Sequence, residues 1–403
     1  MSTSDRIVSA NAFPSRVIRP VERCILKVIH LFRTGNSGYG LERNILCTLP
    51  GLVKLGVETV ALAVTEKRAS PMSQEFADRL ESAGIRFLRV ESEGRLPFSL
   101  ARSFSEVFRA ERPQIIHSHG YKCDVAMLLA DVNSAVRMTT IHGWCSRNVV
   151  ERFYEWIDVQ CCKRMDCTIV FCEDYRQRLL VRGVPDRLVR IVPVGLDSTV
   201  VPGEGEDFRK RWGVPHDAVV VAQIGRLSQE KHPEIFVEAA SQLAYRFPHA
   251  RFMLVGDGPM LDHLKRQAAV AGHSDSIIFT GYLHGMADVL RSLDVAVSCS
   301  STEGLPRTLL EAGVNSVPVV ATSVGGTGDV IENGVTGILC RSGDVTAIEA
   351  GIARLVADAT MRRRMGAAAK ERVATHFSVE ACSRHLVETY ESLCTAAGGK
   401  GTE

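Results

Sequence analysis

The sequence predicts an α/β protein made of two domains, each with a parallel sheet covered by helices on both faces. Three observations predict this class. The chain has 403 residues, which is too long for one ordinary core. Short apolar runs alternate with amphipathic stretches along most of its length. A stretch rich in proline, glycine and acids, VPVGLDSTVVPGEGED, interrupts this alternation near the middle and reads as a linker.

The first domain is expected at residues 21–197, after a polar tail at 1–20 that we expect to be disordered. Its apolar runs predict strands at 25–32, 57–64, 85–90, 114–120, 137–143, 167–172 and 188–195. Amphipathic stretches between them predict helices at 41–56, 72–84 and 149–165. Strands that are apolar throughout are typical of a parallel sheet buried on both faces.

The second domain is expected at residues 209–376, after a linker at 198–208. Its predicted strands are 218–225, 250–256, 276–282, 294–300, 318–323 and 336–340, with helices at 233–247 and 260–272 among them. Parallel sheets of this kind bind ligands at the carboxyl ends of their strands, so two of them can face each other across a cleft. A last amphipathic helix, at 377–396, is predicted to pack back on the first domain.

Composition excludes some classes of function. A net charge of +2 leaves no basic excess for a nucleic-acid partner. The N-terminal stretch lacks a signal-peptide core, and no segment approaches the ~20 apolar residues of a membrane span. We therefore expect a cytoplasmic protein and leave peripheral contact with the inner membrane open. The cysteines at 161, 162, 167 and 172 fit no common zinc spacing and are predicted to be buried thiols.

The segment from Glu303 to Glu311 carries the clearest chemical signal. Pro306 suits the first position of a helix, where its missing N–H costs nothing. The following N–H groups would be unpaired at a positive helix end that suits a diphosphate: those of Arg307, Thr308 and Leu309. Glu311 lies about 7.5 Å further along the axis, where a ribose could follow. In isolation, these residues favour a simpler interpretation, in which Glu303 is a dipole partner of the helix and Glu311 an exposed helical residue.

A second segment follows the strand AVVVAQIG. Gly225, Arg226 and Lys231 stand at the carboxyl end of that strand, where two cations could neutralise a leaving diphosphate. The alternative is a solvated pair of charges before a helix.

In these segments the chain resembles the family-4 retaining glycosyltransferases, from about Ile25 to Leu393. The resemblance implies the GT-B fold of two Rossmann-like domains. It also implies that Glu303 contacts the transferred sugar, that Glu311 binds the ribose and that Arg226 and Lys231 face the diphosphate. Leu305 and Pro306 replace the commoner glycine–aromatic–glycine continuation of the family, so the resemblance does not identify the donor sugar.

Weaker signals complete the donor side. Gly256 and Gly258 form a turn that would border the nucleobase, and the backbone near Tyr282 and Leu283 would meet the base in the family. Glycines in the loop after the first strand, Gly38 and Gly40, correspond to a family loop that borders the donor phosphate and the acceptor; a plain strand–helix turn is the alternative.

The remaining candidates lie in the first domain. His142 matches a family histidine near the reacting sugar, and Arg43 belongs to a frequent Glu–Arg pair that we assign to the acceptor side. The alternate spacing of His117 and His119 raises a metal site, but no carboxylate or further histidine obviously converges on them. We predict instead that they line the acceptor cleft.

The resemblance implies transfer of a hexose-type sugar, with retention of configuration, from a nucleoside-diphosphate sugar to a hydroxyl of a glycan or lipid-linked acceptor. Assembly of a cell-surface polysaccharide or glycolipid is the expected setting, with neither a metal nor a cofactor. Alternatives are a sugar-nucleotide epimerase or a phosphorylase of the same fold, and a non-catalytic sugar-nucleotide-binding subunit. Basic residues at 147, 152, 163 and 164 suit an anionic membrane or simply a solvated helix face.

Overall fold

The computed structural model describes residues 26–33, 39–65, 71–91, 97–144, 149–196, 205–270, 272, 276–283 and 286–398. The predicted tail at 1–20, most of the predicted linker and Gly38 lie outside these residues. Helix α7 (Gly205–Arg211) begins within the last residues of the predicted linker.

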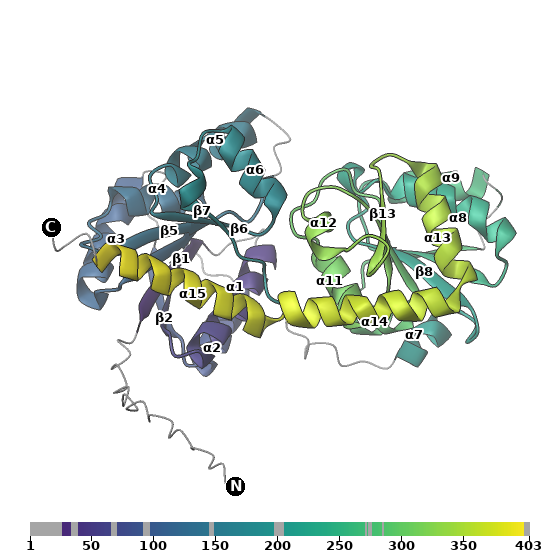
Figure 1. Cartoon of the computed structure of the whole chain (residues 1–403), viewed down its shortest axis with the longest axis horizontal. Coiled ribbons are helices and arrows are strands. Elements are labelled where there is room, and N and C mark those ends of the chain that lie inside the picture. Colours follow the sequence, from purple (N-terminus) through teal and green to yellow (C-terminus); the bar gives the residue numbers. More distant parts are fainter. Residues whose placement is uncertain are drawn as a thin grey trace, which may run out of the picture.

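The described residues form two all-parallel sheets, one in each half of the chain (Figure 1). The first sheet has the order β3-β2-β1-β4-β5-β6-β7 and the second β10-β9-β8-β11-β12-β13. The strands of the first are β1 (Lys27–Arg33), β2 (Glu58–Thr65), β3 (Arg86–Glu91), β4 (Ile115–His119), β5 (Val136–Thr140), β6 (Cys167–Val170) and β7 (Val189–Ile191). Those of the second are β8 (Val219–Ile224), β9 (Ala250–Val255), β10 (Ile277–Gly281), β11 (Val295–Ser298), β12 (Val319–Thr322) and β13 (Gly337–Cys340). Each predicted strand is present, and the predicted fold class is confirmed.

Helices connect the strands and cover both sheets. In the first domain they are α1 (Tyr39–Lys54), α2 (Pro71–Ser82), α3 (Pro97–Glu111), α4 (Tyr121–Leu129), α5 (Val149–Cys162) and α6 (Glu173–Val181). After α7 come α8 (Pro233–Arg246), α9 (Leu261–Val270), α10 (Met286–Ser292), α11 (Arg307–Val314), α12 (Thr327–Val330), α13 (Val345–Ala357), α14 (Ala359–His376) and α15 (Val379–Gly398). Short 3-10 turns lie at Asp186–Leu188 and Gln229–Lys231. Within the described ranges, no helix is both long and apolar enough to cross a membrane.

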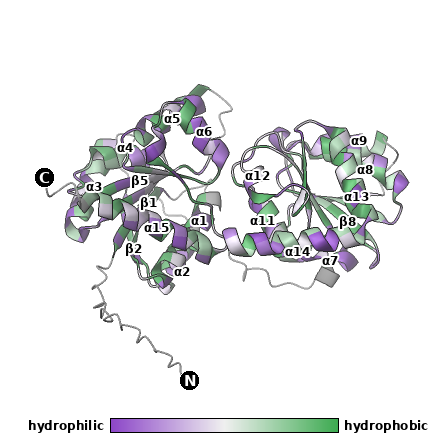
Figure 2. Cartoon of the chain, in the orientation of Figure 1, coloured by the Kyte–Doolittle hydropathy of each residue, from purple (hydrophilic) through white to green (hydrophobic). Residues whose placement is uncertain are grey.

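Both faces of each sheet carry a hydrophobic core. Along β8, Val219 and Val221 pack into one core while Val220 and Ala222 pack into the other. Successive side chains of a strand point to opposite faces, so a strand that is apolar at every position buries both sides. Figure 2 shows this hydrophobic colouring in strands such as β8. The four cysteines of the 161–172 region are free and buried, as predicted.

The last helix returns to the first domain, as predicted. The chain crosses where the Leu196 N–H donates to the Phe377 carbonyl over 2.7 Å. From there α15 runs beside α1 (Figure 1), and its Leu386 and Tyr390 join the core on that side of the first sheet. Tyr390 is fully buried, so a residue near the end of the chain completes a core built mostly from its first 200 residues.

Candidate active site at the carboxyl ends of the two sheets

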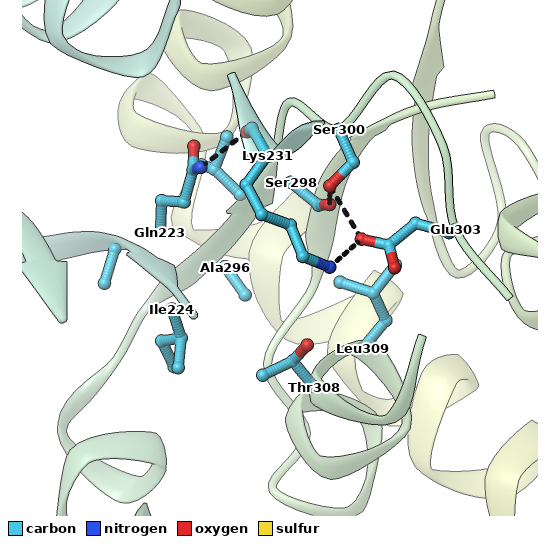
Figure 3. A pocket seen from close by; sticks show the side chains of 11 residues that line it. Gln223, Ile224, Lys231, Ala296, Ser298, Ser300, Glu303, Thr308 and Leu309 are labelled. Atoms are coloured by element: carbon cyan, nitrogen blue, oxygen red, sulfur yellow. Dashed lines mark hydrogen bonds and ion pairs between the residues drawn. The ribbon is translucent and has the colours of Figure 1, made fainter. Parts of the chain in front are cut away.

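Two strand ends of the second sheet bring Lys231 and Glu303 together. Strands β8 and β11 are adjacent and parallel, so the chain leaves both at the same edge. The Lys231 Nζ lies 2.6 Å from the Glu303 Oε1, although the residues are 72 apart in sequence (Figure 3). The two residues predicted to face phosphate and sugar therefore form one ion pair.

Polar neighbours hold this pair in place. The Ser300 hydroxyl donates to the same Glu303 Oε1 over 2.6 Å, and the Gln223 side chain donates to the Lys231 carbonyl over 3.0 Å. These residues, with Thr308, line a pocket at the edge of the sheet (Figure 3). A preorganised pair of this kind can hold a charged ligand without rearranging.

A double-glycine segment that directly follows β12, SVGG at residues 323–326, supports the backbone of Glu303. Gly325 has a φ of 52°, and a Cβ atom there would lie 1.9 Å from the Glu303 carbonyl oxygen. The Gly326 N–H donates to the Gly304 carbonyl over 2.9 Å. Only glycine combines this backbone conformation with so close an approach. The loop after β12 therefore fixes the loop after β11.

Helix α11 begins one residue later than predicted. Pro306 is its N-cap, with φ −74° and ψ 98°, and Arg307 is the first helical residue. The Leu309 N–H donates to the Pro306 carbonyl over 3.1 Å, so the prediction that this N–H is unpaired is wrong. In the part of the chain that is described, the N–H groups of Arg307 and Thr308 have no partner and remain for an anion. Leu305 packs, half-buried, on the core below.

Glu311 is buried inside the site, with 7% of its surface exposed, so the alternative of an exposed helical residue is wrong. The Arg43 Nη2 lies 3.4 Å from the Glu311 Oε1. This carboxylate oxygen has no hydrogen-bond partner among the described residues. Burial raises the pKa of Glu311, while the charges of Arg43 and Arg307 act in the opposite direction. A buried carboxylate oxygen without a hydrogen bond is a ready acceptor for ligand hydroxyls.

The loop after β8 is held by the turn after β9. The Gly225 N–H donates to the Val255 carbonyl over 2.9 Å. Gly256 has a φ of 140°, and a Cβ atom there would lie 1.9 Å from the Gly225 carbonyl oxygen. A Cβ atom on Gly258 would lie 2.3 Å from the Leu227 carbonyl oxygen. These predicted base-side glycines thus position the loop that carries Arg226, whose side chain is exposed.

Two further predicted base contacts follow β10. Tyr282 is 67% exposed, whereas Leu283 is half-buried against the core of the second domain.

The candidate residues of the first domain also lie at a strand-end edge. His142 follows β5, and its Nε2 lies 2.9 Å from the His119 Nδ1. Burial lowers the pKa of His142 to about 4. His117 and His119 are 1% and 8% exposed, so they are parts of the domain interior beside a small pocket rather than an open surface. Gly40 lies in the first turn of α1.

The two edges meet through α1 and α11. The Arg307 Nη1 donates to the Asn44 Oδ1 over 2.9 Å, and the Asn44 Nδ2 lies 3.4 Å from the His142 Nδ1. Arg43, which we predicted on the acceptor side, contacts Glu311. Two consecutive residues of α1, Arg43 and Asn44, thus contact Glu311, the predicted ribose ligand, and His142, a predicted sugar contact.

Two family models match this chain, one to each domain. The model described as Glycosyltransferase Family 4 matches residues 39–200, and the model of Glycosyl transferases group 1 matches residues 204–372, which include the Lys231–Glu303 pair. The chain belongs to the group 1 glycosyltransferases.

Curated relatives of this glycosyltransferase carry sugar-transfer names. A D-inositol 3-phosphate glycosyltransferase of Stackebrandtia nassauensis is 29% identical over 375 residues, covering 85% of this chain and 84% of that protein. A 2-deoxystreptamine N-acetyl-D-glucosaminyltransferase of Streptomyces fradiae is 31% identical over 226 residues, covering 55% of this chain and about half, 52%, of that protein.

Solved structures agree with the GT-B fold. The Anabaena protein HepE, crystallised with UDP, matches with a TM-score of 0.76 at 20% identity, covering 91% of this chain and 100% of that one. A glycosyltransferase from Rickettsia africae matches with a TM-score of 0.76 at 18% identity, covering 91% and 98%.

Some residues of this glycosyltransferase's site escaped the sequence reasoning. Asn44 directly follows the Glu42–Arg43 pair, and its place on α1 beside Arg43 could have signalled it. Ser300 and Gln223 lie on or just after the strands that carry the motifs. His30 and Tyr390 gave no local signal, because their neighbours come from distant parts of the chain.

Proposed function

We propose that this glycosyltransferase moves a hexose-type sugar from a nucleoside-diphosphate sugar to a hydroxyl of a glycan or lipid-linked acceptor, retaining the α configuration. The observation that carries the proposal is the Lys231–Glu303 pair, with a 2.6 Å contact, beside the first N–H groups of α11. Cations and helix N–H groups at one sheet edge suit a diphosphate, and the adjacent carboxylate suits sugar hydroxyls.

In the proposed reaction the sugar's bond to the diphosphate breaks while its bond to the acceptor oxygen forms on the same face. The acceptor proton passes to an oxygen of the leaving diphosphate. Lys231 and Arg226 neutralise the charge that develops there, so we propose that no metal ion is required. Glu303 orients the sugar, and Glu311 accepts hydrogen bonds from the ribose hydroxyls.

A uridine nucleotide is the first donor to test, because the similar Anabaena protein was crystallised with UDP and with UDP-glucose. The experiment is a thermal-stabilisation screen of UDP-, GDP- and ADP-sugars, followed by transfer assays with the sugar nucleotide that stabilises most. The anomeric configuration of the product, read by NMR coupling constants, tests retention. A product with inverted configuration would contradict the retaining mechanism.

We propose that the acceptor is presented at a membrane surface. Helix α5 exposes Phe153 and Trp156, 55% and 57% accessible and stacked with ring centroids 5.9 Å apart. Arg152 is also exposed, whereas the helix's Glu155 and Asp158 are buried. An exposed pair of aromatic residues beside an exposed cation suits an anionic lipid interface.

Vesicle co-sedimentation tests this part of the proposal. We expect the wild type to bind vesicles containing phosphatidylglycerol and the double variant Phe153→Ser/Trp156→Ser to lose most of that binding. Tyr245→Ser is the matched control, since it removes an aromatic that is even more exposed, at 86%, from α8 in the other domain. Equal loss in the control, or no vesicle binding by the wild type, would refute a membrane-facing α5.

A further inference from the structure

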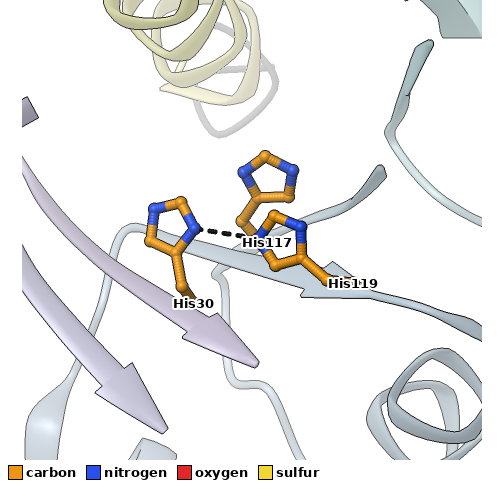
Figure 4. A group of neighbouring side chains, drawn as sticks. All are labelled: His30, His117 and His119. Carbon is orange, nitrogen blue, oxygen red and sulfur yellow. Dashed lines mark hydrogen bonds between the residues drawn. The ribbon is translucent and has the colours of Figure 1, made fainter. Parts of the chain in front are cut away.

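Three histidines of the first sheet lie on one face of adjacent strands. His30 on β1 is in register with His117 on β4, and His119 lies two residues further along β4. Side chains two residues apart share a face of a strand, so the three rings lie together. The His30 Nδ1 is 3.1 Å from the His119 Nε2 (Figure 4), and His119 in turn contacts His142. Four imidazoles therefore connect the sheet interior to the strand-end edge.

Two hydroxyl groups extend this chain. The Tyr390 hydroxyl, from α15, is 2.7 Å from the His117 Nδ1 and 3.4 Å from the His30 Nε2. At the far end, the Thr140 Oγ1 is 2.6 Å from the His117 Nε2. Every ring nitrogen of the four histidines thus has a hydrogen-bond partner. The partners form one unbranched hydrogen-bonded chain, in the order Asn44, His142, His119, His30, Tyr390, His117 and Thr140.

The chain consists of neutral groups. Burial lowers the pKa of His30, His117 and His119 far below the ordinary histidine value, and neighbouring imidazoles lower it further. Burial likewise raises the pKa of the Tyr390 hydroxyl, which stays protonated. A neutral imidazole has one donor nitrogen and one acceptor nitrogen, so the direction of one hydrogen bond sets the direction of the next.

Arg307 sets that direction from the second domain. Its guanidinium can only donate, so the atom of Asn44 that it contacts must be the amide oxygen. The amide nitrogen of Asn44 then donates to the His142 Nδ1. Each following ring must accept at Nδ1 and donate from Nε2, through Tyr390, until the Thr140 hydroxyl accepts the last bond.

We infer that His30, His117, His119 and Tyr390 are positioning residues for His142: their hydrogen-bonded chain holds the His142 Nδ1 as an acceptor at the donor-sugar side. A sugar hydroxyl that replaces the Asn44 amide can donate to this nitrogen without any group in the interior becoming charged or unpaired. The inference rests on the proposed function for the identity of that ligand, but the tautomer itself does not depend on catalysis.

A metal centre explains the same histidines less well. Ligand atoms of His30, His117 and His119 lie within 4.8 Å of one another, which alone would permit an ion. Each ligating nitrogen, however, would need a free lone pair and would exchange a hydrogen bond for the metal. Both nitrogens of His117 already contact hydroxyls at 2.6 and 2.7 Å.

The test reads the tautomer of His142 by ¹⁵N NMR of histidine-labelled, full-length protein, with signals assigned by single His→Gln variants. We expect the wild type to show one neutral form, protonated at Nε2. Tyr390→Phe leaves the His30 Nε2–H without an acceptor, and a buried unpaired donor costs about 1–3 kcal/mol. A second form of His142, protonated at Nδ1, should therefore become populated.

Thr140→Val interrupts the chain at its other end and should have the same effect, even if Tyr390→Phe loosens the packing of α15. Thr168→Val, an equally buried hydroxyl on β6 outside the chain, is the matched control and should leave the His142 signal unchanged. In transfer assays we expect the first two variants to lose about tenfold in kcat/KM while their affinity for UDP alone stays within twofold.

A His142 signal that is unaffected by both chain-breaking variants would overturn the inference. So would stoichiometric binding of Zn²⁺ by the full chain that is abolished in His30→Gln. If the expected tautomer shifts occur but no sugar nucleotide supports transfer, the proposed function fails while the hydrogen-bonded chain stands.

Discussion

The two parallel sheets each gather candidate site residues at the carboxyl ends of their strands, but these two edges differ in their electrostatics. At the second sheet, Lys231 and Glu303 form an ion pair, and Arg226 reaches solvent. At the first sheet, a half-buried imidazole, that of His142, and three buried ones pass neutral hydrogen bonds inward through Tyr390 to Thr140. One parallel-sheet edge can therefore carry charges for a charged ligand, while its counterpart offers neutral groups for an uncharged one.

This difference has a physical reason. A diphosphate brings its own charge, so half-exposed cations can meet it without a large desolvation cost. A sugar has hydroxyls but no charge, and a buried cation beside it would lack compensation. The contacts between Arg307 and Asn44 and between Arg43 and Glu311 join the two edges.

The largest effect is expected at the charged edge. Lys231→Ala and Glu303→Ala should each lower kcat/KM for transfer by about 10²- to 10³-fold, because preorganised electrostatic contacts to the reacting groups are lost. Steady-state kinetics measure this, with Lys265→Ala on α9, an exposed lysine outside the site, as the control. Near-normal transfer by either site variant would contradict the role proposed for the substituted residue.

A smaller effect is expected at Glu311. Glu311→Gln keeps the shape of the side chain but removes its charge, and hydrogen bonds to a charged group contribute about 1.5–3 kcal/mol. We expect UDP affinity, measured by calorimetry, to fall about 10- to 100-fold. An unchanged affinity would exclude Glu311 as the ribose ligand.

The same variant has a pH signature in the absence of ligand. Because the pKa of Glu311 is raised in the folded protein, the folded state keeps a proton that the unfolded chain has already released. This group therefore lowers the free energy of unfolding as pH rises from the ordinary glutamate pKa through the raised one. The Glu311→Gln variant lacks this contribution. As the pH rises through this range, its free energy of unfolding in urea should therefore increase relative to that of the wild type. A difference in free energy of unfolding between variant and wild type that does not change with pH would contradict the raised pKa of Glu311.

The smallest effect is expected where the two edges join. Asn44→Ala removes the link between Arg307 and His142, and one such hydrogen bond contributes about 0.5–1.5 kcal/mol. We expect kcat/KM for the sugar nucleotide to fall about threefold to tenfold, with little change in UDP affinity. Gln74→Ala, whose side-chain contacts stay within the first domain, is the control. An equal loss of UDP affinity would place Asn44 on the nucleotide instead.

Much of the fold could be read from the sequence, because its signal is local. A strand that is buried on both faces must be apolar at successive positions, and this pattern located the strands of both sheets. The pairing of Lys231 with Glu303 was also within reach, since both follow strands of one parallel sheet. The helix boundary at Pro306 was missed by one residue, because the choice between cap and first turn depends on the Leu309–Pro306 hydrogen bond.

By itself, then, the sequence determined the two parallel-sheet domains and the residues that stand at their strand ends. Only the tertiary structure decided which of those residues touch. His30 meets His117 because β1 lies beside β4 in register, and Tyr390 meets both because α15 crosses back to the first domain. Strand order and helix docking depend on how whole surfaces pack together, and no local pattern of residues records that choice.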